Sequence, residues 1–322
     1  MSVGRLALDQ LNISVDNYFA SEVDKFAIKV SQANFPDIIQ LGDIKEISGQ
    51  QLPKIDLLIG GSPCQDLSFA NPDGEGLEGA RSNLFFEYVR LLRETKPKYF
   101  ILENVRMKKE NLERMTESIN LADPGSKIIE PILINSSLVS GQNRLRYYWT
   151  NIPGVAQPKD RNISLMDILE TGNMDYIQAD VLAKNGKKIT RQNINKSICL
   201  SARDWKGWSG HGSVGIRVKS GALRGRSIDS SGKHLAWKSV KPIQVLETRK
   251  DQKSYTVSTV EKDNLVVIDD MYYRKLTCLE MERLQTVPDY FTDYVSMTQR
   301  KKMLGNSFTN EVIKHILKGI TF

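Results

Sequence analysis

A cysteine lies in a glycine- and proline-rich break that follows a short apolar run. Cys64 comes directly after Pro63, and the apolar run Leu57–Ile59 ends in Gly60 and Gly61. Such a run indicates a buried strand of an α/β sheet, and these sheets bind ligands beyond the carboxyl ends of their strands. Proline fixes φ and glycine permits close approach, so the loop would present the thiol in a set direction. A buried structural cysteine is an equally good interpretation of this segment alone.

A carboxylate and two arginines supply further groups for chemistry. Glu103 ends a second apolar run, Tyr99–Leu102, which we interpret as a central strand. A carboxylate at a strand end beside an exposed thiol loop is a pairing that nucleophilic attack on a ring requires. Arg144 and Arg146 point the same way if their segment is extended, and arginine contacts base edges and phosphates. On their own, two such arginines are ordinarily surface charges.

Four segments, taken in chain order, resemble the motifs of the cytosine-5 DNA methyltransferases. They are the Pro-Cys-Gln, Glu-Asn-Val, Gln-x-Arg-x-Arg and Gly-Asn-Ser segments at residues 63–65, 103–105, 142–146 and 305–307. Each segment is a weak signal, but the four in order are specific and cover most of the chain outside its middle. The compact chain favours the bacterial or phage type, and the run 15–93 is also similar to the de novo animal class. The resemblance implies an α/β fold: a Rossmann-like S-adenosylmethionine-dependent methyltransferase sheet with a smaller, mixed target-recognition domain.

The resemblance also implies a DNA cytosine-5 methyltransferase that works through a covalent Cys64 adduct. Carbon 5 of cytosine is a poor nucleophile, so a thiolate must first add to carbon 6. Glu103, protonated or hydrogen-bonded, would stabilise the charge that builds towards ring nitrogen 3, and Arg144 would hold the base oxygen or the adjacent phosphate. S-adenosyl-L-methionine would supply the methyl group without a metal, and the cytosine must be flipped out of the duplex. The catalytic residues implied are Cys64, Glu103, Arg144 and Arg146.

Acidic residues at two predicted strand ends suit the adenosine half of that cofactor. Glu22 ends the predicted strand Asn17–Glu22, where an acid can accept hydrogen bonds from ribose hydroxyls. Asp43 follows the predicted strand Ile38–Leu41 and resembles the family residue that accepts from the adenine amino group. A solvated glutamate and an ordinary Gly-Asp turn are the alternatives. The cofactor-binding residues that the resemblance implies are Gly4, Glu22, Val23, Asp43, Ile44, Pro63, Leu84, Asn306 and Ser307.

The N-terminal segment departs from the family pattern. The resemblance calls for a strand and a glycine turn ahead of the helix predicted over Met1–Leu11, whereas the sequence begins inside that turn, with Ser2–Gly4 as its remnant. We therefore expect the first strand of the sheet to be missing and the methyl-donor site to be incomplete. Since a misplacement of about 1 Å can cost on the order of a hundredfold in rate, activity should suffer more than cofactor affinity.

Charge and cysteine content bound the partners and the compartment. The 322 residues carry a formal charge of +7, which suits a polyanionic partner, although many basic proteins bind no nucleic acid. The 3 cysteines and 3 histidines lack metal-ligand spacing, so we expect no metal and a reduced, cytoplasmic setting in a bacterium or a phage-infected host. No apolar run approaches the roughly 20 residues of a membrane span. We expect a monomer that acts on double-stranded DNA, with a cognate restriction endonuclease as a candidate partner.

The chain divides into three expected parts. Residues 1–150 would form the catalytic domain, 151–272 the target-recognition domain, and 273–322 a bracing helix and a C-terminal helix that returns to the catalytic domain. The middle part lies outside the resemblance, and its tryptophans and basic residues suit phosphate and base-edge contacts. They equally suit a small domain that uses tryptophan as core. The nucleic-acid-binding residues expected are Gln65, Ser68, Gln142, Arg217, Arg224 and Arg226.

Two other functions stay open at this point. A tRNA cytosine-5 methyltransferase shares the Pro-Cys-Gln and Glu-Asn-Val segments, but the extended basic middle part argues against it. A non-catalytic DNA-binding homologue would explain an incomplete cofactor site. The joint presence of the predicted nucleophile, acid, arginines and cofactor-binding acids favours an enzyme.

Overall fold

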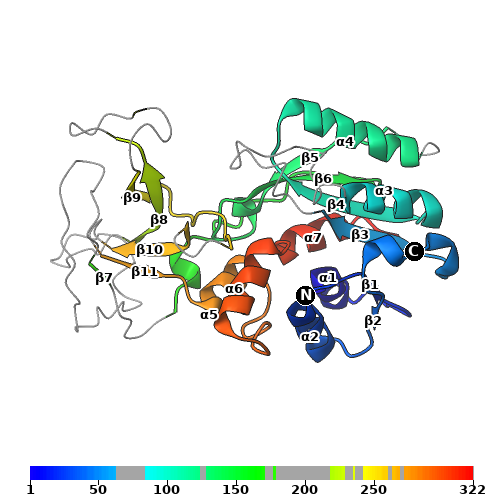
Figure 1. Ribbon diagram of the computed structural model, residues 1–322, viewed down its shortest axis with the longest axis horizontal. Helices are drawn as coiled ribbons and strands as arrows, with labels where there is room; N and C mark the ends of the chain where they lie inside the picture. Colours follow the sequence, from blue (N-terminus) through cyan, green and yellow to red (C-terminus); the bar gives the residue numbers. More distant parts are fainter. Residues whose placement is uncertain are drawn as a thin grey trace. The chain divides into compact units, whose positions relative to one another are not determined.

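The computed structural model describes residues 1–62, 84–123, 128–170, 177–178, 218–228, 235, 242–259, 263–268 and 272–321 (Figure 1). The chain forms two compact units. The first comprises Met1–Ser136, Leu145–Lys159 and Phe308–Phe322, and the second comprises Ser137–Arg144 and Asp160–Ser307. These packing units differ from the division expected at residues 150 and 272, which stays a prediction about functional domains.

A four-stranded sheet forms the centre of the first unit. Its strands, in spatial order, are β3 (Leu57–Gly61), β4 (Tyr99–Val105), β6 (Leu145–Thr150) and β5 (Ile132–Asn135). β3 and β4 are parallel, whereas β6 runs antiparallel to both of its neighbours. Every residue of β4 is buried, which explains why the strand begins as a continuous apolar run. The predicted strands are confirmed, but β4 is longer than expected, so that Glu103 lies within the strand.

Two short strands form a second, parallel sheet in the same unit, β1 (Phe19–Ala20) and β2 (Ile39–Gln40). They lie inside the two segments predicted as strands and are shorter than predicted. The helices of the unit are α1 (Val3–Gln10), α2 (Lys25–Asn34), α3 (Leu84–Thr95), α4 (Lys109–Ala122) and α7 (Asn310–Leu317). The short 3-10 turns of this unit are η1 (Ile44–Glu46) and η2 (Gly49–Gln51), whereas η4 (Ser136–Leu138) begins at its boundary and η5 (Met166–Ile168) belongs to the second unit.

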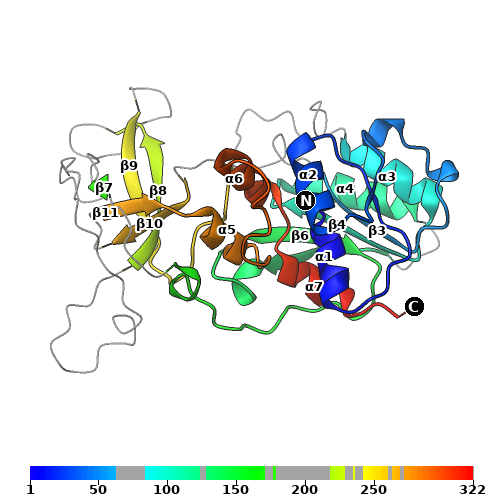
Figure 2. The ribbon, with the colours of Figure 1, turned by 90° about the horizontal axis from the view of Figure 1, so that it is seen from below.

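Helices cover both faces of the central sheet (Figures 1 and 2). Ile59 of β3 faces α1, where a Cβ added to Gly4 would lie 2.9 Å from the Ile59 side chain. The next residue, Gly60, faces α3, and a Cβ there would lie 2.5 Å from the Tyr88 ring. Successive strand residues point to opposite faces, so α1 and α3 lie on opposite sides. The core beneath α3 and α4 includes Phe85, Leu92, Phe100, Leu102, Met115, Ile119 and Trp149.

An antiparallel sheet dominates the described part of the second unit. In spatial order its strands are β7 (Ile177–Gln178), β11 (Tyr272–Lys275), β10 (Leu265–Ile268), β8 (Val218–Arg226) and β9 (Ile243–Thr248). Leu223, Leu246, Leu265 and Val267 pack together on one face of it. The opposite face of β8 and β9 therefore carries the alternate residues, among them Arg224 and Arg226.

Two helices complete the described part of the second unit, α5 (Cys278–Leu284) and α6 (Met297–Asn306). The bracing helix expected within residues 273–322 begins at Cys278, because Thr277 and Glu280 form a capping box that fixes the first turn. Arg274 lies in β11 and donates to both carboxylate oxygens of Glu280 at 2.7 Å. This buried pair ties strand β11 to helix α5. The C-terminal helix expected within residues 273–322 is present as α7 (Asn310–Leu317), in the first unit.

Candidate active site

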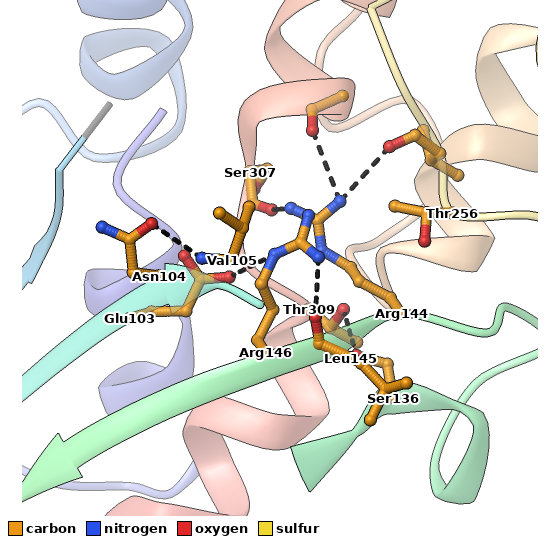
Figure 3. Close-up of polar contacts among 12 residues, drawn as sticks. Glu103, Asn104, Val105, Ser136, Arg144, Leu145, Arg146, Thr256, Ser307 and Thr309 are labelled. Atoms are coloured by element: carbon orange, nitrogen blue, oxygen red, sulfur yellow. Dashed lines mark hydrogen bonds and ion pairs between the residues drawn. The ribbon is translucent and has the colours of Figure 1, made fainter. Parts of the chain in front are cut away.

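A buried ion pair joins two strands of the central sheet in the first unit (Figure 3). Arg146 Nε lies 3.2 Å from Glu103 Oε1, and the side chains are only 13% and 11% exposed. Glu103 faces Tyr148 across the β4–β6 pair, and Val105 faces Arg146, so the charged residues are diagonal neighbours on one face. A charge this deeply buried needs its partner, since removal of one leaves the other uncompensated.

A glycine makes room for this carboxylate at the end of β3. Gly61 is the parallel neighbour of Glu103, and a Cβ built on it would lie 3.5 Å from Glu103 Oε2. The same Cβ would lie 2.8 Å from the ring of Phe308, which is closer than real side chains approach. The three groups therefore converge at the end of β3, and Gly61 precedes Cys64 by three residues in the sequence. Sequence reasoning missed Phe308, whose one signal is its place directly after Gly-Asn-Ser.

Asn104 binds the residue that follows β3. Its Nδ2 donates to Ser62 Oγ at 2.8 Å, and its Oδ1 accepts from the Val105 N–H at 2.7 Å. The bond to Ser62 therefore ties β4 to the chain just beyond the end of β3. The predicted residues Pro63, Cys64, Gln65 and Ser68 lie outside the described residues.

Arg144 is a buried residue of the second unit and binds backbone oxygens. Its Nη1 donates to the carbonyls of Val257 at 3.2 Å and Gly305 at 3.4 Å, and its Nη2 donates to the carbonyl of Ser307 at 2.7 Å (Figure 3). Arg144 thus binds backbone carbonyls, whereas Arg146 pairs with a carboxylate. These contacts suit a bracing role for Arg144, and the base or phosphate contact expected from the sequence stays a prediction.

Gln142 is fully buried in the same unit. Its Nε2 donates to the Leu284 carbonyl at 2.6 Å and to Gln285 Oε1 at 3.0 Å, and its Oε1 accepts from the Val257 N–H at 3.2 Å. Both ends of the amide are therefore used by protein groups. Gln142 thus links the 141–144 segment to helix α5 and to Val257, and the nucleic-acid contact expected for it stays a prediction.

The two predicted cofactor acids follow β1 and β2 in the first unit. Glu22 Oε1 accepts from the N–H groups of Val23 at 2.8 Å and Asp24 at 2.9 Å, just before helix α2. Asp43 is exposed, and its Oδ1 accepts from the Lys45 N–H at 3.0 Å as the cap of η1, which begins at Ile44. Because β1 and β2 are parallel, both acids lie at the same end of their sheet. Val23 leaves 71% of its surface exposed beside them.

The other predicted cofactor residues fall in three places. Gly4 lies in the first turn of α1, where a Cβ would come within 3.0 Å of the Tyr18 hydroxyl. Burial raises the pKa of Tyr18 to about 12, so this phenol is neutral at physiological pH. Leu84 begins α3 in the same unit and is half-buried. Asn306 and Ser307 belong to the second unit, where Asn306 is exposed and the Ser307 carbonyl accepts from Arg144.

The chain matches the C-5 cytosine-specific DNA methylase family over residues 2–321. The chain belongs to this family. Family membership makes it a relative of DNA cytosine-5 methyltransferases. The family match confirms the resemblance drawn from the four sequence segments.

Individual relatives share parts or nearly all of the chain. It is 32% identical over 195 residues to the orphan methyltransferase M.SPRI of Bacillus phage SPR, which spans 58% of this chain but 42% of the phage protein. It is 26% identical over 314 residues to the type II methyltransferase M.FnuDI of Fusobacterium nucleatum, which spans 94% of this chain and 86% of that protein. The chain thus matches about two fifths of the length of the phage methyltransferase.

A solved structure supports the fold of this family member. The chain superimposes on a DNA modification methyltransferase encoded within an E. coli prophage with a TM-score of 0.58 at 21% identity. The match covers 99% of this chain and 94% of that one. The predicted Rossmann-like methyltransferase fold is therefore confirmed.

Two of the three basic residues expected to bind nucleic acid lie on β8, in the second unit. Arg224 Nε lies 3.8 Å from Glu247 Oε2, and Arg226 Nη2 lies 2.6 Å from Glu247 Oε1. Both arginine side chains stay more than one third exposed. The third, Arg217, lies outside the described residues. Among the residues that are described, no three His, Cys, Asp or Glu side chains cluster as metal ligands, and no helix could span a membrane.

Proposed function

We propose that this chain is an S-adenosyl-L-methionine-dependent DNA cytosine-5 methyltransferase that acts through a covalent Cys64 adduct. The observation that carries the proposal is the buried Glu103–Arg146 pair beside Gly61, three residues before Cys64. A carboxyl group and a guanidinium held together, next to a thiol loop, match the donors and acceptors on one edge of cytosine. Family membership supplies the reaction class.

Cys64 opens the reaction. Its thiolate adds to carbon 6 of the flipped cytosine, and the electrons of the carbon 5–carbon 6 double bond move towards ring nitrogen 3. Glu103 takes up a proton when the base binds, gives it to nitrogen 3, and takes it back later. After methyl transfer, water takes the carbon-5 proton, the carbon 5–carbon 6 double bond re-forms, and the bond to Cys64 breaks to release the thiolate.

Arg146 takes the role that the sequence assigned to Arg144. As the residue in contact with Glu103, it orients the carboxyl group and can donate to the base oxygen adjacent to nitrogen 3. Arg144 and Gln142 support it indirectly, because they fix the segment that leads into β6.

The described residues at the ends of β1 and β2 fit the adenosine part of S-adenosylmethionine. Glu22 and Asp43 offer carboxylate oxygens to hydroxyl and amino groups, and Val23 offers an exposed apolar surface that an adenine ring would cover. Ile44, Leu84 and Gly4 complete the set in the first unit, with Asn306 and Ser307 as further candidates. The bound cofactor supplies an electrophilic methyl group without a metal. Double-stranded DNA is the proposed substrate, and its target base must leave the stack at a cost of a few kcal/mol.

The first test is methyl transfer to DNA. The protein is incubated with tritiated S-adenosylmethionine and either duplex DNA or tRNA, and we expect label in the duplex only. Label in tRNA alone would replace the proposal with a tRNA cytosine-5 methyltransferase. Label in neither nucleic acid, with DNA still bound, would favour the non-catalytic homologue.

The second test addresses the adduct itself. A duplex with 5-fluorocytosine in place of cytosine cannot lose the group at carbon 5, so it should trap a covalent complex that survives denaturing electrophoresis. Cys64→Ala should abolish this complex, whereas Cys278→Ala, a buried cysteine of the second unit, should keep it. A trapped complex in the Cys64→Ala protein would assign the nucleophile elsewhere.

The remaining expectations concern partners and location. M.FnuDI is named a type II methyltransferase, which supports a role for this chain in restriction-modification with a cognate restriction endonuclease. We further propose a monomer in the bacterial cytoplasm. Light scattering of the purified protein tests whether it is a monomer, and sequencing of the flanking genes tests the presence of an endonuclease.

A further inference from the structure

One short segment of the second unit binds the Arg144 loop at consecutive positions. We call Ser254–Val257 the strap. The Ser254 N–H donates to the Gly141 carbonyl at 2.7 Å, and the Ser254 carbonyl accepts from the Asn143 N–H at 3.0 Å. Thr256 Oγ1 donates to the Asn143 carbonyl at 2.7 Å. The position of the 141–144 loop is therefore set, residue by residue, by the strap.

The end of the strap holds the two side chains that the family motif contributes to this loop. The Val257 N–H donates to Gln142 Oε1 at 3.2 Å, and the Val257 carbonyl accepts from Arg144 Nη1 at 3.2 Å. Val257 is only 1% exposed, so water does not compete for these bonds. A shift of the strap would move Arg144 with it.

Tyr255 of the strap contacts a different element, the sheet of the same unit. Its N–H donates to Ser220 Oγ on β8 at 2.9 Å. Its ring lies 5.6 Å from the Arg224 guanidinium and 5.2 Å from that of Arg249. Arg224 alternates with Leu223 along β8, so this cluster lies on the face opposite the small core.

The cluster has the chemistry of a nucleic-acid contact. Its guanidinium groups are held by carboxylates, since Arg249 pairs with Asp251 and both Arg224 and Arg226 pair with Glu247. Arg224 stays 39% exposed, so a phosphate or a base edge can replace its carboxylate partner. Hydrogen bonding from Arg249 lowers the pKa of Asp251, so the arginine is held by an ionised group rather than left disordered. An aromatic ring with cations beside it also offers a face for stacking.

We propose that the Arg224–Tyr255–Arg249 cluster contacts the DNA, and that the strap passes this contact to the loop that carries Gln142 and Arg144. Recognition of the duplex and positioning of Arg144 are then one event. The proposal rests on the proposed function, because it needs duplex DNA as the substrate. It goes beyond that function by naming the positioning residues, Tyr255 and Thr256.

Thr256→Val separates the two halves of the proposal. Valine keeps the shape of threonine and removes the hydroxyl that binds the Asn143 carbonyl. The control is Thr298→Val, an exposed threonine of α6 in the same unit. With duplexes in which a central cytosine has randomised flanks, we expect Thr256→Val to lower the single-turnover rate about tenfold, with the DNA Kd changed less than twofold. Thr298→Val should match the unaltered protein in both.

Arg249→Gln tests the DNA contact itself. We expect a DNA Kd about tenfold weaker and a salt dependence whose slope falls by about one charge. Tyr255→Phe should keep near-normal binding because it keeps the ring, whereas Tyr255→Leu should weaken binding and slow transfer together. An unchanged salt slope in Arg249→Gln would show that Arg249 makes no DNA contact, and normal DNA binding by Tyr255→Leu would remove Tyr255 from the contact.

Coupling is measured by combining Arg249→Gln with Thr256→Val. If the strap transmits the contact, the loss of preference for the best flanking sequence in the double variant will be no larger than in Thr256→Val alone. Additive losses, or a Thr256→Val rate equal to that of Thr298→Val, would overturn the inference while leaving the methyltransferase function intact. No methyl transfer by the unaltered protein would instead overturn the function on which the inference rests.

Discussion

Arg144 and Arg146 are separated by one residue, and both are nearly buried, but the groups that bind them differ. Arg146, on strand β6, binds the ionisable carboxylate of Glu103. Arg144 donates to the main-chain carbonyls of Val257, Gly305 and Ser307. A carboxylate changes its charge during a reaction, whereas a carbonyl dipole does not. The comparison therefore supports the proposal that Arg146 takes part in the chemistry and that Arg144 supports its own loop.

The largest expected effect is at the acid. Glu103→Gln keeps the shape of the side chain and removes its proton chemistry, so the single-turnover rate of methyl transfer should fall about 10²–10⁴-fold. DNA affinity should change by less than a few fold. Glu113→Gln, an exposed glutamate of α4, is the matched control and should be indistinguishable from the unaltered protein. A rate loss under tenfold at Glu103 would remove it from the reaction.

The second effect separates the two arginines by stability and rate. Arg146→Met leaves the Glu103 carboxylate buried without its cation, which should cost about 3–5 kcal/mol of unfolding free energy. Adding Glu103→Gln should restore part of that loss, because the uncompensated charge is gone. Both energies come from urea unfolding curves of the single and double variants.

Arg144→Met should behave differently, because it leaves carbonyls rather than a charge unsatisfied. We expect a loss of about 2–4 kcal/mol that Glu103→Gln does not restore. The rate per folded molecule should fall about tenfold, less than for Arg146→Met. Restoration of Arg144→Met by Glu103→Gln would mean that the two arginines share one partner after all.

The third effect concerns the space around the acid. Gly61→Ala places a methyl group against Phe308 and near Glu103, so the strand end must shift. We expect about 1–3 kcal/mol of destabilisation and a slower methyl transfer. Phe308→Leu, which shortens the opposing side chain, should relieve much of both effects in the double variant. Equal stability of Gly61→Ala and the unaltered protein would show that this packing is loose.

The smallest expected effect is confined to alkaline pH. Burial raises the folded pKa of Tyr18 to about 12, above its ordinary value near 10. The contribution of the neutral phenol to the unfolding free energy is thus complete below pH 10 and is lost as pH rises through the folded pKa. A difference of two pKa units corresponds to about 2.7 kcal/mol. Between pH 9 and 12 the unfolding free energy, from urea unfolding at each pH, should depend less on pH in Tyr18→Phe, and an unchanged pH dependence would contradict the burial of this phenol.

The sequence was most informative where one short segment determines its own structure. The apolar runs before Gly60 and Glu103 predicted β3 and β4, because buried parallel strands need continuous apolar residues. The Gln-x-Arg-x-Arg spacing was less informative. The partners of Arg144 lie more than 100 residues further along the chain, at Val257 and Ser307, and no local sequence pattern predicts them.

Residues without a motif were missed altogether. Phe308 touches Gly61 only because α7 returns to the sheet, and Tyr255 lies between two arginines only because three segments meet. Arg224 was found by its charge, and Arg249 was not, although both lie beside the same ring. Contacts between distant segments depend on the tertiary fold, so they cannot be predicted from local patterns in a single sequence.

The position of Glu103 inside β4 has a consequence for how this chain can change over time. Its approach to Gly61 and Arg146 depends on the register of β4 with both neighbouring strands. An inserted or deleted residue between Tyr99 and Glu103 would turn the carboxylate to the opposite face of the sheet, because side chains alternate along a strand. Substitutions in this stretch can change the site by a small or a large amount, whereas any change of one residue in length moves the carboxylate away from Arg146. Insertions and deletions among homologues are therefore expected in the connecting segments and not in β4.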